Sequence, residues 1–313
     1  MDNKRPLQAH LSLLAAQVCW GLMSPIGKDA MSRGLSGLDM VTFRVAGAAI
    51  LFWLSSLVAR GEHVPIKDVF KLGAAALFGV TLNQCMFTIG LSFTSPINAS
   101  IATTSMPIFA MLLSFLILRE PLSLLKVSGV AIGCSGAVIL ILTSISAGSS
   151  KVGDIRGDLL CMAAQLSFAL YLSLFSKFVK QYSAITVNKW MFTWATLYVL
   201  PFSSGNLAAI SWQTIPLSVW METVYVVVMG TFVSYLLMMF AQQTLRPTVV
   251  SIYNYVQPIV AVTASVLTGL GVFKPAQGLA IILVFGGVWM VTKSKSRRDV
   301  EKASANASGA LRH

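Results

Sequence analysis

Residues 94–118 read T-S-P-I-N-A-S-I-A-T-T-S-M-P-I-F-A-M-L-L-S-F-L-I-L, and residues 245–269 read L-R-P-T-V-V-S-I-Y-N-Y-V-Q-P-I-V-A-V-T-A-S-V-L-T-G. The two stretches align without a gap at an offset of 151 positions. Apolar matches are common in an apolar chain, so the matching prolines and glycines carry most weight. They are Pro96 with Pro247, Pro107 with Pro258, and Gly136 with Gly287. The chain therefore contains an internal repeat, which constrains every later assignment of fold.

Each copy of the repeat is read as an apolar helix with an interior proline, a short turn and a Gly-rich apolar helix. A proline inside a helix frees a backbone carbonyl and bends the helix axis. We therefore expect Pro107 and Pro258 to act as kinks or hinges. Repeats of this kind in a polytopic membrane protein are typical of transporters.

The composition indicates a membrane protein. Of 313 residues, 56% are hydrophobic and 11% are charged, whereas soluble domains carry about 25% charged residues. The formal net charge of +12 fits lipid headgroups and loop orientation better than a nucleic-acid partner. Four cysteines without C-x-x-C spacing predict neither disulfides nor a metal site.

The apolar stretches predict ten transmembrane helices, because only helices or closed barrels satisfy the backbone in lipid and these lengths suit helices. The fold class expected is an all-α integral membrane protein with ten helices in two inverted five-helix repeats. The predicted spans are 8–30, 36–59, 68–92, 96–118, 123–143, 157–179, 184–204, 215–243, 247–270 and 273–292.

The distribution of Lys and Arg predicts the orientation. With the N-terminus inside, 17 basic residues fall on the cytoplasmic side and five on the other, while Arg44 lies inside a span. Both termini are then cytoplasmic. Five spans per half is an odd number, so the second half must enter the membrane from the opposite face, which makes the repeat inverted. The expected units are a first repeat (1–143), a linking loop (144–156), a second repeat (157–292) and a disordered basic tail (293–313).

Six stretches along the chain are informative when taken together: A-A-Q-V-C-W-G at 15–21, L-D-M-V-T-F-R at 38–44, T-L-N-Q-C-M-F-T-I-G-L at 81–91, T-S-P-I-N-A-S-I at 94–101, P-I-F-A-M-L-L-S-F-L-I-L-R-E-P-L at 107–122 and Y-N-Y-V-Q-P-I-V-A at 253–261. With these stretches the chain resembles, over about residues 8–292, the drug/metabolite transporter superfamily, specifically its EamA-type ten-helix permeases. The resemblance implies a secondary transporter of small polar metabolites with a central cavity between the halves. The acidic residue that follows the fourth helix in the family is present as Glu120, but its equivalent in the second half is Gly271.

Polar residues inside spans are the candidates for a substrate site, because they are costly in lipid. Gln17, Trp20, Ser24 and Lys28 recur at helical spacing on one face of the first span. They could line a pore, or pack between helices with Lys28 reaching the outer interface. Arg44 could hold a carboxylate or phosphate through its guanidinium, or tie down a helix end or a lipid phosphate.

The other candidates supply neutral hydrogen-bonding groups that could bind a substrate or join helices to one another. Freed carbonyls near Pro258 could add to a cavity. The set comprises Asn83, Gln84, Thr103, Thr104, Gln165, Tyr171, Tyr235, Tyr253, Asn254 and Gln257.

Glu222 is the clearest acidic residue inside a predicted span, so it is a candidate for proton coupling, with an interfacial position as the alternative. The first span contains no acid between residues 11 and 27. The small multidrug exporters carry a glutamate in their first helix, so this absence argues against a drug/proton antiporter of that kind. A facilitator or an exchanger fits equally well.

The function predicted is secondary transport of a small polar metabolite, an amino acid or a related compound, outward across the inner (cytoplasmic) membrane by alternating access. Import, or antiport of an anionic metabolite or nucleotide sugar, stays open. A membrane-embedded enzyme is disfavoured because His10, His63 and His313 are scattered and the acids lie near the interfaces. We expect no cofactor, no metal and no nucleic acid; the partners are the metabolite and the bilayer, and the oligomeric state is open.

Overall fold

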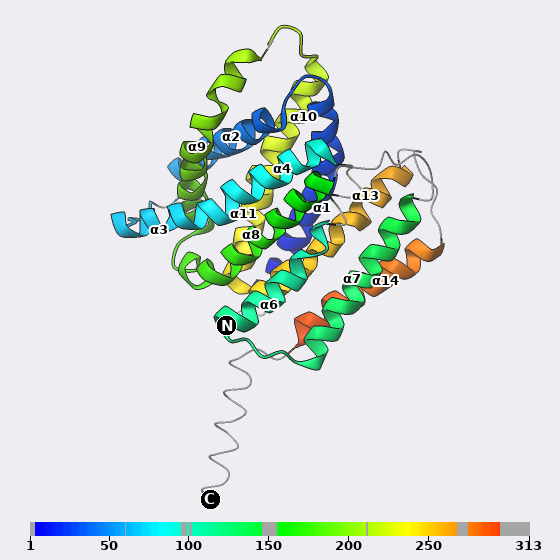
Figure 1. Cartoon of the computed structure of the whole chain (residues 1–313). Coiled ribbons are helices and arrows are strands. Elements are labelled where there is room, and N and C mark those ends of the chain that lie inside the picture. Colours follow the sequence, from blue (N-terminus) through cyan, green and yellow to red (C-terminus); the bar gives the residue numbers. More distant parts are fainter. Residues whose placement is uncertain are drawn as a thin grey trace, which may run out of the picture.

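The computed structural model describes residues 4–59, 61–94, 99, 102–145, 155–210, 212–267 and 275–294. Within these ranges every regular element is a helix (Figure 1). Three shorter apolar stretches also lie in helices: Met106–Leu118, Leu124–Gly136 and Gly278–Lys293. Five are long and apolar enough to cross a bilayer, namely Pro6–Ser32, Gly37–Val58, Ile66–Phe93, Ile155–Val179 and Leu217–Thr244. The expected class, an all-helical membrane protein, agrees with these helices.

Most helices before residue 146 follow the expected spans closely, but α6 begins at Met106, ten residues after the predicted start at 96, and residues 95–98, 100 and 101 lie outside the described ranges. A capping box formed by Ser36 and Asp39 begins the second helix, and Arg119, with a φ of 53°, ends the sixth. The elements are α1 (Lys4–Ser32), α2 (Gly37–Val58), α3 (Ile66–Ala76), the π-helix η1 (Leu77–Leu82), α4 (Asn83–Phe93), α6 (Met106–Leu118) and α7 (Leu124–Ile145).

The helices after residue 154 repeat this order. The run α10, η2 and α11 begins and ends 151 positions after α3, η1 and α4, so the offset seen in the sequence recurs in the helix boundaries. The elements are α8 (Ile155–Val179), α9 (Ala184–Ala209), α10 (Leu217–Val227), the π-helix η2 (Val228–Val233), α11 (Ser234–Thr244), α12 (Pro247–Ile252), the 3-10 turn η3 (Tyr253–Tyr255), α13 (Val256–Leu267) and α14 (Pro275–Lys293).

The two halves interlock through contacts that occur in matching pairs. Helix α1 packs against α11 and α13, and α8 packs in the same way against α4 and α6. Helices α2 and α9 pack together, as do α7 and α14, which lie side by side in Figure 1. Each half therefore inserts its first helix between helices of the other half.

The α7–α14 pair comes together where both helices carry glycine. A Cβ atom on Gly287 would lie 2.6 Å from the carbonyl oxygen of Gly129, and one on Gly136 would lie 2.8 Å from that of Ala280. Backbone therefore meets backbone, as is common between helices in membranes.

The paired prolines lie at the beginnings of helices. Pro107 is the second residue of α6, and Pro258 is the third residue of α13, directly after η3. Helix α12, the turn η3 and helix α13 follow one another without a gap from Pro247 to Leu267, with the 3-10 turn lying just before Pro258. The kinks predicted at Pro107 and Pro258 stay predictions. The expected linking loop and tail fall mostly on residues 146–154 and 295–313, which lie outside the described residues, as does Gly271.

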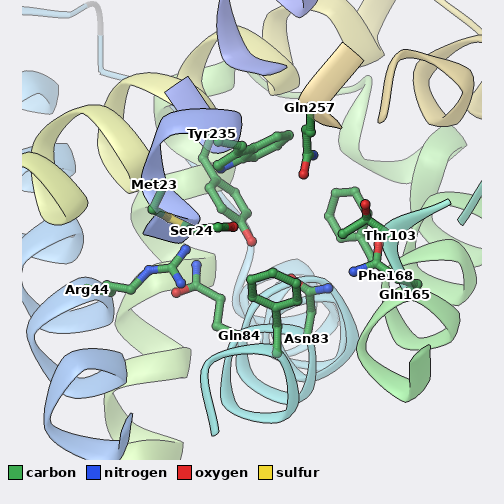
Figure 2. A pocket seen from close by; sticks show the side chains of 12 residues that line it. Met23, Ser24, Arg44, Asn83, Gln84, Thr103, Gln165, Phe168, Tyr235 and Gln257 are labelled. Atoms are coloured by element: carbon green, nitrogen blue, oxygen red, sulfur yellow. The ribbon is translucent and has the colours of Figure 1, made fainter. Parts of the chain in front are cut away.

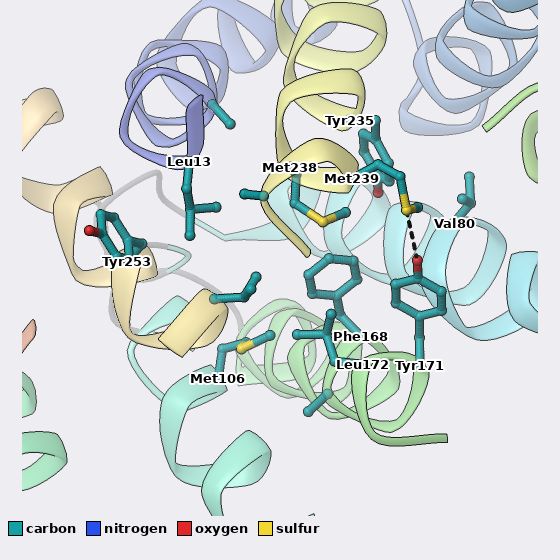
Figure 3. Close-up of a cluster of buried hydrophobic side chains, with 14 of the residues drawn as sticks. Leu13, Val80, Met106, Phe168, Tyr171, Leu172, Tyr235, Met238, Met239 and Tyr253 are labelled. Atoms are coloured by element: carbon teal, nitrogen blue, oxygen red, sulfur yellow. Dashed lines mark hydrogen bonds between the residues drawn. The ribbon is translucent and has the colours of Figure 1, made fainter. Parts of the chain in front are cut away.

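A cluster of buried apolar side chains fills the space around the first half of α1 (Figure 3). Leu13 of α1, Met106 of α6, Leu172 of α8 and Met238 of α11 belong to it, and all are almost fully buried. Both halves of the chain thus contribute to one core.

Candidate functional site

A cavity lies between the two halves (Figure 2). It holds about 520 Å³ of space between protein atoms, its open mouth included. Its walls come from α1, α2, α4 and the turn before α6 on one side, and from α8, α11 and α13 on the other. The lining residues are Trp20, Met23, Ser24, Arg44, Asn83, Gln84, Phe87, Thr103, Gln165, Phe168, Tyr235 and Gln257.

Helix α1 brings Trp20 and Ser24 of the predicted stripe to the cavity. The indole Nε1 of Trp20 donates to the carbonyl oxygen of Gly230 in η2 at 2.9 Å. A π-helix leaves backbone groups out of the regular α-helical pattern, so this bond fixes the ring and gives the carbonyl a partner.

Gln17 lies one turn earlier on α1 and joins a buried amide network instead of lining the cavity. Its Nε2 donates to Oδ1 of Asn254 at 3.0 Å, and its Oε1 accepts from Nε2 of Gln257 at 2.7 Å. Of these three residues only Gln257 lines the cavity. The network links α1 to η3 and α13 at the boundary between the cavity and the apolar cluster.

Lys28, at the other end of the stripe, lies outside the lining. Its Nζ donates to the carbonyl oxygens of Leu91, Ser92 and Thr94, at 2.7, 2.9 and 3.0 Å. These carbonyls end α4 and have no partners within the helix, so a cation there satisfies them and complements the helix dipole. Lys28 therefore caps a helix in this structure.

Arg44 projects from α2 into the cavity wall and is 4% exposed. Its Nε donates to the hydroxyl of Thr231 at 3.0 Å, and its Nη1 donates to the hydroxyl of Thr88 at 3.1 Å. Both partners are neutral. Neither a helix end nor a carboxylate holds the guanidinium among the described residues.

Gln84 and Tyr235 face each other across the cavity from α4 and α11, at positions related by the 151-residue offset. The Tyr235 hydroxyl donates to the carbonyl oxygen of Gly79 at 3.3 Å. Gln84 is 1% exposed, and within the described residues neither of its amide atoms makes a hydrogen bond of good geometry, although the Tyr235 hydroxyl lies nearby. A buried amide without partners is costly, so such a group needs a specific reason.

The remaining polar lining residues are neutral. Asn83 donates from Nδ2 to the carbonyl oxygen of Ala164 at 2.9 Å, which ties α4 to α8. Thr103 and Gln165 complete the wall, and both are buried.

Besides Gln17 and Lys28, four further predicted candidates lie away from the cavity. Thr104 is buried next to Thr103, and Asn254 belongs to the Gln17 network. The hydroxyl of Tyr171 donates to Oε1 of Gln242 at 3.1 Å inside the core, and that of Tyr253 pairs with Nδ1 of His10 at 2.8 Å. In this structure the four pack between helices.

The two acidic residues of interest form ion pairs outside the cavity. Glu222 pairs with Arg33, which also pairs with Asp29, near the end of α1. Glu120 pairs with Lys126 at 2.8 Å in a buried setting and accepts from Thr248 at 3.1 Å. Among the described residues, no three His, Cys, Asp or Glu side chains lie close enough to hold a metal ion.

Three apolar lining residues, Met23, Phe87 and Phe168, were absent from the predicted set. A search for polar residues inside spans cannot find them. Helical periodicity offers a signal: Met23 and Phe87 lie three residues after Trp20 and Gln84, and Phe168 lies three after Gln165, hence on the same helix faces.

Comparison with known proteins gives consistent matches along the chain. The model of the EamA-like transporter family matches residues 7–142 and 155–293. Similar proteins include the uncharacterized transporter YetK of Bacillus subtilis (strain 168), 22% identical over 96% of this chain and 92% of YetK. Another is WAT1-related protein At5g13670 of Arabidopsis thaliana, 20% identical over 95% of this chain and 86% of that protein. A solved crystal structure with 17% identity shares the fold, with a TM-score of 0.70 over 91% of this chain and 95% of its own.

Proposed function

The chain belongs to the EamA-like transporter family, a part of the drug/metabolite transporter superfamily, and on that premise we propose that it is a secondary transporter of a small polar metabolite, either amino-acid-like or anionic. The observation that carries the proposal is the cavity itself. Its walls come from both halves of the chain, and most of its lining side chains are polar although they lie between apolar helices. Polar groups in such a place are costly, which makes them candidates for binding a solute.

The mechanism proposed is alternating access between two inverted repeats. The shared 151-residue offset of the helix boundaries, the paired contacts between halves and the two segments matched by the family model support it. In such proteins the halves exchange roles around a site near the bilayer midplane. In this proposal the protein lies in the inner membrane and both of its termini are cytoplasmic. Export is the direction of transport that the family resemblance favours.

The transport proposal can be tested without knowing the substrate. Proteoliposomes loaded with a mixture of amino acids, organic acids, nucleosides and sugar phosphates are followed by mass spectrometry. Wild-type protein should deplete a subset of the compounds faster than Ser24→Trp, because Ser24 lines the cavity and a tryptophan there would fill it.

The matched control is Ser135→Trp, which alters an exposed position on α7 and should deplete the same subset as wild type. Equal depletion by wild type and by a monodisperse Ser24→Trp protein would contradict transport through this cavity.

A further inference from the structure

The cavity wall carries a positive charge and no negative charge to balance it. Of its twelve lining residues, Arg44 alone carries a formal charge, since the set contains no Asp, Glu, Lys or His. The position in α9 that corresponds to Arg44 at the 151-residue offset is Ala195, a small buried residue. The second half therefore contributes no balancing charge at the matching position.

The Arg44 guanidinium has donors to spare. It has five N–H groups, and among the described residues it donates hydrogen bonds to Thr231 and Thr88. A cation buried with neutral partners alone has lost its water without gaining a counter-charge. An anion in the cavity would restore that counter-charge, and a carboxylate suits the planar guanidinium best because it can accept two parallel hydrogen bonds.

Gln84 supplies a second donor near this point. Its side chain and that of Arg44 converge on the same part of the cavity in Figure 2. The Nε2 of this buried amide carries two N–H groups, so it can donate one to the oxygen of the Tyr235 hydroxyl, whose own proton goes to Gly79, and the other to an anion. A carboxylate could therefore accept hydrogen bonds from both Gln84 and Arg44.

The other lining residues would pack well against an apolar part of a ligand. Trp20, Phe87 and Phe168 present rings or ring edges, and Met23 adds a flexible thioether. Aromatic side chains bury large apolar areas, and methionine adapts to the shape of a ligand. A hydrocarbon or aromatic group would pack here without leaving polar atoms unpaired.

The wall offers no carboxylate to a positively charged group. An ammonium in the cavity would lose its hydration and gain only neutral partners, and it would lie close to a buried guanidinium. We propose that the ligand of this cavity is a small monocarboxylate with an apolar or aromatic body, whose carboxylate binds Arg44 and Gln84. This inference rests on the proposed function and narrows its substrate from polar metabolites in general to organic acids without an amino group.

The preference for a carboxylate is tested by measuring the binding of ligands to the purified full chain. The ligands within each set share one hydrocarbon skeleton and differ in charge. The aromatic set is hydrocinnamate, phenylalanine, phenethylamine and hydrocinnamide, which are an anion, a zwitterion, a cation and a neutral amide. The aliphatic set is isocaproate, leucine and isoamylamine. Ligand-dependent thermal stabilisation ranks affinities. Hydrocinnamate or isocaproate should bind at least about tenfold more tightly than its zwitterionic and cationic partners.

Two variants tie the preference to the assigned residues. Arg44→Gln should abolish binding of the acids, whereas the control Arg33→Gln, at an exposed ion pair outside the cavity, should keep it. Ser24→Asp places a carboxylate in the cavity wall and should shift the preference from hydrocinnamate toward phenylalanine. This second variant keeps the test decisive if Arg44→Gln does not fold.

The inference is overturned if phenylalanine or phenethylamine binds as tightly as hydrocinnamate, if neither acid binds, or if Arg44→Gln keeps the preference. These outcomes are separate from those of the depletion experiment. Wild-type protein that depletes only amino acids would leave transport standing and refute the monocarboxylate, whereas no depletion of any compound together with acid-selective binding would refute transport alone.

Discussion

The two π-helical segments, η1 and η2, occupy equivalent positions in the two halves but meet different neighbours. A Cβ on Gly79 of η1 would lie 2.7 Å from the ring of Tyr171, whereas one on Gly230 of η2 would lie 2.8 Å from the side chain of Met23. Each glycine carbonyl accepts a hydrogen bond from an aromatic side chain: Tyr235 donates to Gly79 and Trp20 to Gly230. The backbone plan is shared, and the side chains differ.

Because of this difference, the side chain near η2 borders the polar cavity, whereas the side chain near η1 is packed in the apolar core. Trp20 lines the cavity, but its equivalent, Tyr171, is fully buried in the core. A repeat can thus keep one backbone framework while equivalent positions in the two halves carry side chains of different charge and polarity. The pairs at the 151-residue offset that differ in this way are Trp20 with Tyr171, Arg44 with Ala195, and Gln84 with Tyr235.

The largest difference in the free energy of unfolding should appear when the glycine of each π-helix is replaced by alanine. Gly79→Ala should lower the free energy of unfolding by about 1–3 kcal/mol, because the enclosed Tyr171 ring cannot move aside. Gly230→Ala should cost less than about 1 kcal/mol, because Met23 is flexible and borders the cavity. Reversible unfolding in mixed micelles measures both, and equal losses would mean that the two segments are packed alike.

A smaller effect should follow from removing one hydrogen bond at each aromatic equivalent. Trp20→Phe and Tyr171→Phe remove bonds to the Gly230 carbonyl and to Gln242, and each should cost about 0.5–1.5 kcal/mol. Because Trp20 alone of the two lines the cavity, Trp20→Phe should also change hydrocinnamate affinity while Tyr171→Phe leaves it intact. A loss of affinity in both variants would show that the core residue also shapes the site.

The smallest effect should come from the equivalent charged positions Lys71 and Glu222, which carry opposite charges. Lys71 pairs with Asp68 and Glu222 pairs with Arg33, and both pairs are partly exposed. Lys71→Gln and Glu222→Gln should each cost less than about 1 kcal/mol, as surface ion pairs do. Neither should alter the pH dependence of flux in proteoliposomes. A flattened pH profile in Glu222→Gln alone would restore this residue as a coupling site.

Much of the framework was accessible from the sequence because it depends on length and polarity. Apolar stretches of bilayer length predicted the helices, for example Gly37–Val58 against the expected 36–59. The rule that polar residues in spans are costly selected nine of the twelve lining residues. It failed for Met23, Phe87 and Phe168, because an apolar residue in an apolar helix carries no such cost.

The same rule also selected polar residues that are satisfied by hydrogen bonds to other parts of the protein. Lys28 is satisfied by the carbonyls that end α4, and Gln17 is satisfied by two other amides. Their partners lie more than 60 positions away along the chain, so no local pattern distinguishes a polar side chain that caps a helix from one that awaits a ligand. The 3-10 turn η3 before Pro258 was not predicted as a separate element, although a proline disturbs the backbone four residues earlier, which here is Asn254 in that turn.

The most direct test of the central claim, a single cavity that opens to each side in turn, is the labelling of one position from both faces of the membrane. A single cysteine at Ser24, in a chain whose Cys19, Cys85, Cys134 and Cys161 are replaced by alanine, is exposed to a membrane-impermeant maleimide in right-side-out and in inside-out vesicles. The loop variant His63→Cys provides the control for sidedness, because it should react from the cytoplasmic face alone. We predict that Ser24→Cys reacts from both faces; reaction from one face only, with the control behaving as expected, would contradict alternating access.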